Sequence, residues 1–424
     1  MTAPAMRRLA PGFRKQMFAE RRRQVAEVFE LDDRDFAASR SPEMQDLADM
    51  MIESAIGVMP IPLGVATGFM IDGTNVDIPL ATEEPSVVAA AGYAARIIGS
   101  SGFETWATEP VMQAQIFLEH ADAAAEKRIA SAENELKHSL GSHLRSLERR
   151  GGGFRGLSTT RLADPDLLQV DLYIDVRDAM GANLLNTAAE ALQGDLERLS
   201  GGRTLMSILS NQAALRRAGA LFRLPIERLA RAAQGTAPEE TARRIVLASD
   251  LAQKNPERAV THNKGIMNGI SALALATGND TRAVEAGAHA WSARSGQVRG
   301  LSRYRLQARS LEGWIELPLA LATVGGAVNT HPVSRATLGI LGQPDSRRLA
   351  RIGAAVGLAQ NFAAVLALVS GGIQKGHMKL HAARLAFQAG ARGDEVRAVA
   401  DRMADLNSYR LDDAAEALSR LRRP

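Results

Sequence analysis

Four short segments of the chain gather acidic, basic and imidazole side chains among small residues, while the surrounding sequence is mainly apolar. Groups of these types transfer protons, stabilise an oxyanion or bind a substrate when a fold brings them together. The segments are 81–86, 178–183, 261–269 with 277–280, and 376–381. Because they are far apart in sequence, they form one site only if the tertiary structure collects them.

Each segment also has an interpretation that needs no chemistry. Glu84 suits the positive end of a following helix, and Asp178 suits the cap of a helix that begins near Gly181. Asp280 could be an ordinary turn or cap residue. Lys264 and Asn268 are four residues apart and share a helix face, where a lysine is usually solvated. None of the segments is sufficient alone to establish a site.

The histidines do not predict a metal site. His377 and His381 share a helix face, but no carboxylate or third histidine lies near them in sequence. The chain has no cysteine and no H-E-x-x-H motif, so thiolate ligands are excluded and a zinc hydrolase has little support. Neither G-x-G-x-x-G nor a Walker A loop occurs, so a nucleotide would have to bind in another way.

The composition is that of a folded globular protein. The length of 424 residues suggests two to four domains at roughly 100 to 200 residues each. The formal net charge is only +4 and aromatic residues make up 4%, which does not favour nucleic-acid binding. A basic helical nucleic-acid-binding protein therefore remains a secondary alternative, and we expect no nucleic-acid partner.

The sequence predicts a cytoplasmic protein without a membrane partner. Residues 1–23 are basic but lack the apolar stretch of a signal peptide. The uncharged segment 352–374 is long enough to span a bilayer, but Gln360 and Asn361 interrupt it. We therefore expect a buried core helix there.

Apolar periodicity and turn residues predict the order of the elements. The N-terminal part predicts helices over 15–31 and 42–56, a hairpin within 56–79 turning at Asp72-Gly73, and a helix over 86–98 capped by Thr82. The next part predicts a strand over 113–119, a helix over 122–149, strands over 154–160 and 167–176, a helix over 183–199, and a strand over 204–209. That β-α-β-β-α-β order is typical of an inserted ferredoxin-like domain. From Gly376 onward the sequence predicts two or three helices.

Nine ordered blocks of sequence resemble class II, bacterial-type 3-hydroxy-3-methylglutaryl-coenzyme A (HMG-CoA) reductase. The blocks are 51–57, 62–66, 83–91, 175–183, 261–269, 276–280, 285–290, 357–361 and 376–378. The resemblance implies an α+β fold with a large α-rich substrate domain, an inserted ferredoxin-like cofactor domain that is not a Rossmann fold, and a small C-terminal helical flap. The implied boundaries are 1–110 with 211–375 for the large domain, 111–210 for the small domain and 376–424 for the flap.

The resemblance also implies an NAD(P)H-dependent oxidoreductase that interconverts HMG-CoA with mevalonate and CoA by two successive hydride transfers. Lys264 matches the cation that stabilises the oxyanion, and Glu84 matches the proton donor, a role for which burial would have to favour the protonated carboxyl. Asp280 matches the aspartate that links these two side chains by hydrogen bonds. His377 matches the histidine that protonates the departing CoA thiolate.

Binding residues carry over from the family in the same way. Those around the HMG group and the CoA phosphates match Arg258, Ser86, Asn211, Asn268 and Arg14. Those of the nicotinamide-cofactor loop match Asp178, Met180, Gly181 and Asn183. No metal is implied.

Two departures from the family pattern bear on these expectations. Ser54 replaces an asparagine, with no evident consequence. The segment 143–150 lacks the aspartate that NAD-specific relatives carry before the glycine run and has several arginines instead, so we expect NADPH to be accepted.

Active sites in this family lie at a dimer interface, so a homodimer or a hexamer built from dimers is implied. The expected ligands are HMG-CoA, mevalonate and CoA. The main alternative is a catalytically silent CoA-binding or regulatory protein of the same fold. It is disfavoured because all four catalytic positions hold the residue that the family requires.

Overall fold

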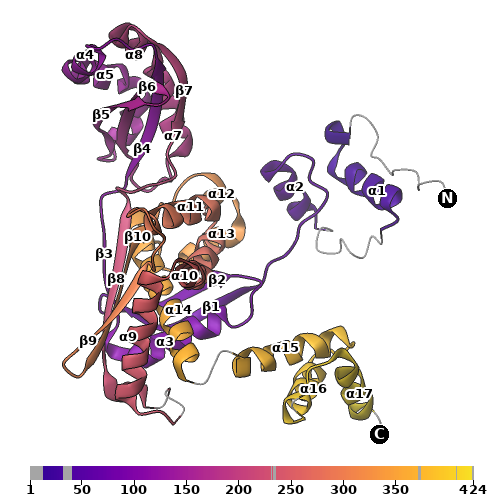
Figure 1. Ribbon diagram of the computed structural model, residues 1–424. Coiled ribbons are helices and arrows are strands. Elements are labelled where there is room, and N and C mark those ends of the chain that lie inside the picture. The colour runs from indigo at the N-terminus through magenta and orange to yellow at the C-terminus, as the bar shows by residue number, and fades with distance from the viewer. Residues whose placement is uncertain are drawn as a thin grey trace, which may run out of the picture.

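The computed structural model describes residues 13–31, 41–230, 232, 235–370, 374–406 and 408–422, with the backbone alone for Arg14 and residues 374–380. Among these residues, buried apolar side chains form one large cluster and three smaller ones. Figure 1 shows a central body with a small α/β unit at one end, and N-terminal and C-terminal helices that project from the body.

The central body contains a hairpin and a four-stranded sheet. Strands β1 (Leu63–Ile71) and β2 (Thr74–Ala81) pair antiparallel, and Asp72 and Gly73 both have positive φ at the predicted turn. The antiparallel sheet has the order β3-β8-β10-β9. Its strands are β3 (Glu104–Ala107), β8 (Arg217–Pro225), β9 (Ser302–Gln307) and β10 (Ser310–Pro318).

In the part of the chain that the structure describes, seven helices complete the central body. They are α3 (Val87–Ile98), α9 (Pro238–Lys254), α10 (Pro256–Ala276), α11 (Thr281–Ser292), α12 (Gly326–Thr330), α13 (Pro332–Ile340) and α14 (Ser346–Ser370). Helices α3, α9, α11 and α14 pack on this sheet, while α10 and α13 pack on strand β2 of the hairpin. Short 3-10 helices occupy Phe13–Lys15, Gly99–Ser101 and Ile226–Leu229. Sheet and helices meet at the rings of Phe222, Tyr304 and Phe362, whose centroids lie 5.1 to 6.4 Å apart.

Helix α14 is the buried core helix that the sequence predicts. Among the described residues it is the one helix long and apolar enough to cross a membrane, but 78% of its most apolar window is buried inside the protein. It packs closely on α10 at two glycines. A Cβ at Gly269 would lie 2.8 Å from Val356 Cγ1, which is too close for two carbon atoms. A Cβ at Gly357 would likewise lie 2.6 Å from Ile270 Cδ1. The two glycines therefore let α14 fix the position of α10.

The small unit has the predicted β-α-β-β-α-β order. Strands β4 (Val111–Glu119), β5 (Gly153–Ala163), β6 (Asp166–Asp175) and β7 (Arg203–Leu209) form a sheet of order β5-β6-β4-β7. Each neighbouring pair is antiparallel. This topology is that of a ferredoxin-like sandwich and differs from a Rossmann sheet, whose strands are parallel.

The helices of the small unit are shorter than predicted. The single helix predicted over 122–149 is three helices, α4 (Ala125–Ser131), α5 (Glu133–Ser139) and α6 (Gly141–Glu148). The helix predicted over 183–199 is α7 (Ala182–Ala191) and α8 (Gln193–Ser200). Breaks near Ala132, Leu140 and Leu192 let successive segments bury apolar residues against the twisted sheet, which one straight helix cannot follow.

Two helical segments lie outside the main cores. At the N-terminus, α1 (Phe18–Phe29) and α2 (Pro42–Met51) are the predicted helices, although α2 ends five residues earlier than expected. At the C-terminus, α15 (Gln374–Gln388), α16 (Asp394–Asp405) and α17 (Leu411–Leu421) surround an apolar cluster of their own. The C-terminal helices lie apart from the central body in Figure 1.

Candidate active site

Lys264 and Glu84 meet at a cavity of about 520 Å³ in the central body. Lys264 Nζ donates a hydrogen bond to Glu84 Oε2 at 2.8 Å and thereby joins α10 to the loop after β2. Their side chains are 60% and 37% exposed, so the pair is accessible to a substrate. The other polar residues that line the cavity are Thr82, Glu83, Asn268, Ser271, Thr281, Glu285 and His289.

The face of α10 turned away from the cavity is held by a buried polar network. His262 Nε2 lies 2.7 Å from Ser302 Oγ, which donates to Asn361 Oδ1 at 2.8 Å. Tyr304 donates its hydroxyl proton to the same Asn361 oxygen at 2.8 Å. Burial, with a smaller contribution from the charge of Arg258, lowers the pKa of His262 to about 3, so the imidazole is neutral. The network therefore fixes the rotation of α10 and, with it, the direction of Lys264.

The loop that carries Glu84 has a different local structure from the one predicted. Thr82 does not cap α3, because its hydroxyl oxygen accepts the Glu84 backbone N–H at 3.1 Å within the loop. Ser86 is the N-cap residue and adopts a left-handed conformation with φ of 73°. The resulting turn directs Glu84 towards α10.

Asp280 lies beside the cavity but does not contact Lys264 or Glu84. Its carboxylate accepts the backbone N–H groups of Arg282 at 3.0 Å and Ala283 at 3.2 Å, and so caps α11. Burial raises the pKa of Asp280, but these hydrogen bonds and the Arg282 guanidinium outweigh burial and lower the pKa overall. The next residue, Thr281, does line the cavity. The linking role predicted for Asp280 stays a prediction.

Of the predicted substrate-binding residues whose side chains the structure describes, Asn268 lines the cavity and Arg258, Ser86 and Asn211 do not. Arg258 lies in the first turn of α10, and partial burial lowers its pKa. Asn211 lies in the turn after β7, where a Cβ at Gly287 would be 3.1 Å from the Asn211 carbonyl oxygen. This turn therefore packs on α11. Ser86 occupies the N-cap of α3.

Two predicted site side chains lie outside the described residues. The backbone of Arg14 belongs to the first 3-10 helix, and the backbone of His377 belongs to α15. A described contact does join α15 to the site, because Arg384 Nη2 donates to the Glu83 carbonyl oxygen at 3.0 Å. Arg384 follows His377 by two helical turns.

The predicted cofactor loop lies where the small unit meets the central body. The Asp178 carboxylate accepts the Ser346 backbone N–H at 2.8 Å, at the first residue of α14, and its carbonyl oxygen accepts the Thr323 N–H at 2.9 Å. Arg216 lies buried beneath the loop and donates to the carbonyl oxygens of Ala179 at 2.9 Å and Leu321 at 2.6 Å. Burial lowers the pKa of Arg216 to about 10, although the charge of Asp178 opposes this shift. The loop is therefore anchored to both units.

Gly181 has a conformation that requires glycine. Its φ is 96°, and a Cβ there would lie 2.6 Å from Val176 Cγ1. It is the N-cap of α7, and Asn183 follows in the first turn with an exposed side chain. The Met180 carbonyl oxygen lies 3.5 Å from Arg216 Nη1. The backbone N–H groups at the start of α7 thus lie beside the interface between the two units.

Comparisons with known proteins decide the family. The sequence model described as hydroxymethylglutaryl-coenzyme A reductase matches residues 17–382. The chain is 44% identical to 3-hydroxy-3-methylglutaryl-coenzyme A reductase of Archaeoglobus fulgidus, over 99% of this chain and 96% of that relative. It is 36% identical to the probable reductase of Borreliella burgdorferi, over 88% of this chain and 85% of that relative.

The chain belongs to the HMG-CoA reductase family.

The solved structures agree with this assignment. The HMG-CoA reductase of Streptococcus pneumoniae superposes with a TM-score of 0.75 at 40% identity, over 97% of this chain and 99% of that one. A structure of the class II enzyme from the same organism, bound to NADPH in open conformations, also has a TM-score of 0.75 and covers 95% of this chain. The predicted class and fold are confirmed, and the activity is that of an HMG-CoA reductase, an oxidoreductase.

Two cavity residues of this reductase received no role from the sequence. Glu285 and His289 lie four residues apart on α11 and both line the cavity. Glu285 Oε1 accepts the Ser271 hydroxyl proton at 2.6 Å. Both residues fall within the seventh of the nine family blocks, and their spacing on one helix face is the signal that would have identified them.

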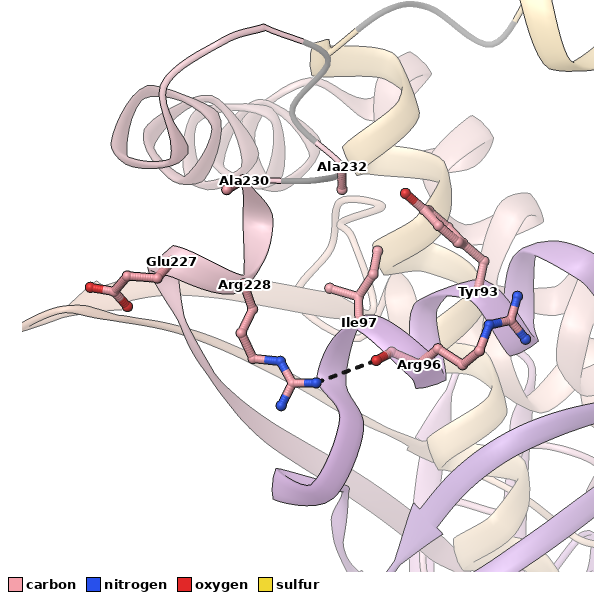
Figure 2. Close-up of a pocket in the computed structure, with 7 residues that line it drawn as sticks. All are labelled: Tyr93, Arg96, Ile97, Glu227, Arg228, Ala230 and Ala232. Atoms are coloured by element: carbon pink, nitrogen blue, oxygen red, sulfur yellow. Dashed lines mark hydrogen bonds between the residues drawn. The ribbon is translucent and has the colours of Figure 1, made fainter.

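The described residues also line a cavity that lies away from the candidate site. A cavity of similar volume, about 520 Å³, lies beside the end of α3 and contains none of the predicted site residues. There Arg228 Nη2 donates to the Arg96 carbonyl oxygen at 3.4 Å, as Figure 2 shows. Within the part of the chain that the structure describes, no group of three or more histidine, aspartate or glutamate side chains could hold a metal ion.

Proposed function

We propose that the cavity between α10 and the Glu84 loop is where the HMG-CoA thioester is reduced to mevalonate and CoA by two hydride transfers from NAD(P)H. The observation that carries the proposal is the 2.8 Å hydrogen bond between Lys264 and Glu84, which are 180 residues apart in the chain. Such a pair in an open cavity provides both a cation and a proton-transferring carboxyl group.

Each of the two side chains has a distinct role in the proposal. The Lys264 ammonium stabilises the negative charge that develops on the carbonyl oxygen when hydride arrives. Glu84 supplies a proton to the oxygen of the aldehyde intermediate, a role that requires its carboxyl to be shielded from water once the substrate is bound. Asn268, one helical turn from Lys264, orients the substrate from the same helix face.

Asp280 and His377 complete the proposed constellation. Asp280 reaches the pair only if it exchanges its contact with Arg282, whose side chain is 91% exposed, for one with Lys264. His377 protonates the CoA thiolate when the C-terminal helices close over the cavity. The contact of Arg384 with the Glu83 carbonyl supports closure, because it joins α15 to the loop that carries Glu84.

The proposed cofactor site comprises the loop of Asp178, Met180, Gly181 and Asn183. The start of α7 offers unpaired backbone N–H groups that favour a phosphate. We further propose that NADPH is used. Arg145, Arg149 and Arg150 are exposed near the glycine run, none of them has a carboxylate partner among the described residues, and no acid occupies the position that would repel a 2′-phosphate.

The overall organisation remains part of the proposal. The separate apolar clusters support a large domain of 1–110 with 211–375, a small domain of 111–210 and a flap of 376–424. Exposed apolar residues near α2 support a homodimer or a hexamer built from dimers; they include Met50, Met51, Ile52 and Met59. We also propose that the enzyme is cytoplasmic.

The decisive experiment follows nicotinamide absorbance after purified protein is mixed with HMG-CoA and either NADPH or NADH. We expect oxidation of two cofactor molecules for each HMG-CoA consumed, with a higher kcat/KM for NADPH. Binding of CoA without oxidation of either cofactor would instead identify the catalytically silent alternative. A preference for NADH would overturn the cofactor proposal alone.

A further inference from the structure

Four arginines converge on the side of α11 that faces away from the catalytic cavity. Arg217 belongs to β8, Arg303 to β9, and Arg294 and Arg299 to the connection between α11 and β9. The guanidinium carbons of Arg217 and Arg294 lie 5.1 and 4.0 Å from the centre of the Trp291 ring. One aromatic side chain thus holds two cations in place.

The cluster carries an excess of positive charge. Among the described residues, Glu316 is the one carboxylate that interacts with it, and it pairs with Arg217 through Nη1 at 2.5 Å. In the described part of the chain, Arg294, Arg299 and Arg303 have no carboxylate within ion-pair distance, although all three are exposed. Four cations against one anion leave a local charge of about +3, and this repulsion destabilises the fold unless an anion offsets it.

The electrostatic environment of Arg294 is consistent with this charge imbalance. Partial burial lowers the pKa of its guanidinium, and the charges of Arg303, Arg217 and Arg299 lower it further against the opposing effect of Glu316. The guanidinium is also held by a 2.6 Å hydrogen bond from Nη1 to the Trp291 carbonyl oxygen. The group is therefore fixed by the protein close to other cations, and some of its donors remain available.

We propose that Arg294, Arg299 and Arg303 bind a phosphate-bearing ligand, with Arg217 and Trp291 holding the cluster from behind. Guanidinium groups donate in pairs to phosphate oxygens, and three of them suit a pyrophosphate or a phosphomonoester better than a single carboxylate. The site is distinct from the catalytic cavity. Trp291 lies about 200° around α11 from the cavity residue His289.

The ligand has two chemical sources. One is a phosphate of the enzyme's own CoA or nicotinamide substrates, whose tails extend beyond the reacting groups. The other is a separate phosphorylated metabolite that binds whether or not the cavity is occupied. Both present the same anionic oxygens, so the first measurement uses inorganic pyrophosphate alone.

The test is calorimetric titration of the full-length protein with pyrophosphate at constant ionic strength. We expect the double variant Arg294→Gln/Arg303→Gln to bind about a hundredfold more weakly, since a tenfold loss for each charge-assisted contact is typical. The control Arg397→Gln should bind like the wild type. Arg397 is 91% exposed on α16 and lies 3.9 Å from Asp401.

A variant that should bind pyrophosphate more tightly keeps the test independent of folding defects, because misfolding would only weaken binding. Glu316→Gln removes the one acid of the cluster and should tighten pyrophosphate binding about tenfold, because the local positive charge rises. Equal affinity in the wild type and the double variant, or no binding by the wild type, would overturn the proposal. These titrations need no turnover, so they succeed or fail independently of the proposed reaction.

Competition then identifies the source of the phosphate. If saturating CoA or NADPH displaces pyrophosphate, and the double variant raises KM for that substrate without changing kcat, the site holds a tail of the enzyme's own substrate. If pyrophosphate binds equally well in the presence of both, the site takes a separate phosphorylated ligand. Either outcome supports an anion site at this cluster.

Discussion

Helices α10 and α15 each carry a residue of the predicted catalytic set, but the protein holds them in opposite ways. Helix α10 crosses the central body and is fixed from behind by buried hydrogen bonds of His262, Ser302 and Asn361. Helix α15 packs in a small cluster of its own, and the described residues join it to the site through the hydrogen bond from Arg384 to the Glu83 carbonyl oxygen. Figure 1 shows α10 inside the body and α15 apart from it.

We interpret this difference as a division of the proposed roles between the two helices. A cation that must stabilise a developing oxyanion acts best when it is preorganised, because any reorganisation would add to the barrier. A proton donor for a departing thiolate is needed only after the substrate has bound, so it can be delivered by a closing element. We therefore expect changes in α10 to affect every step, and changes in α15 to affect only the steps that involve CoA.

The largest expected effect is that of Lys264→Ala. Loss of an oxyanion-stabilising group lowers kcat by about a hundred- to a thousandfold, so cofactor oxidation in saturating HMG-CoA should fall by that factor. The melting temperature should stay within a degree or two of the wild type, because the Lys264 side chain is 60% exposed.

Lys254→Ala is the matched control, since it removes an exposed lysine at the end of α9 and should leave both quantities unchanged. A Lys264→Ala enzyme with near wild-type turnover would contradict the role of α10 as the preorganised element.

The next effect is that of His377→Ala, and it is selective. Reduction of HMG-CoA should slow by about a hundredfold, because a positioned general acid typically contributes at least that much. Reduction of added mevaldehyde, which releases no thiolate, should continue at nearly the wild-type rate. Parallel assays of the two substrates measure the difference.

His381→Ala lies one helical turn further along α15 and should affect neither substrate. Equal losses for HMG-CoA and mevaldehyde in His377→Ala would mean that α15 acts on both hydride steps, and the division between the two helices would then be wrong.

The sequence predicted the parts of the site better than their local geometry. The lysine and the glutamate were assigned through the family blocks, and the structure brings them to 2.8 Å. The sequence left Asp280 open between a turn or cap residue and the carboxylate that links Lys264 and Glu84, because both use the same residue type in the same short segment, and the structure shows it as the cap of α11. The prediction that Thr82 caps α3 was wrong. The N-cap is Ser86 in a left-handed conformation, which a sequence usually signals by a glycine, and no glycine stands there.

For the fold, too, the sequence predicted which elements form better than it predicted their local geometry. The β-α-β-β-α-β order of elements in the small unit followed from apolar alternation, which depends on burial of one sheet face. The breaks at Ala132 and Leu140 did not, because neither residue interrupts a helix by its own conformational preference. They depend on the curvature of the sheet beneath, which is a property of the tertiary structure.

A smaller effect concerns the network behind α10. The pKa of His262 falls from 6.5 to about 3 on folding, so the unfolded chain binds a proton that the folded chain does not. The stabilising effect of the neutral histidine is complete above pH 6.5 and is lost as the pH falls towards 3, at up to about 1.4 kcal/mol per pH unit. His262→Gln should therefore be less stable than the wild type by about 1 to 3 kcal/mol at neutral pH but show a flatter pH dependence.

Urea unfolding at a series of pH values measures both quantities, with His138→Gln on the exposed face of α5 as the control. An unchanged slope between pH 6.5 and 4 in His262→Gln would show that another group causes the acid sensitivity.

The smallest expected effect is that of Arg384→Ala, which tests how α15 is held near the cavity. The side chain is exposed and makes one charge-assisted hydrogen bond to a carbonyl oxygen, so its loss should destabilise the docked position of α15 by only about 0.5 to 1 kcal/mol. If closure over the cavity depends on this contact, HMG-CoA reduction falls by about two- to fivefold while mevaldehyde reduction is unchanged. Arg397→Ala, on the neighbouring helix α16, is the control for loss of an exposed arginine. An equal fall with both substrates would place Arg384 with the loop of Glu84 rather than with delivery of His377, because both assays include the aldehyde reduction in which we propose that Glu84 acts, whereas the thiolate leaves in only one of them.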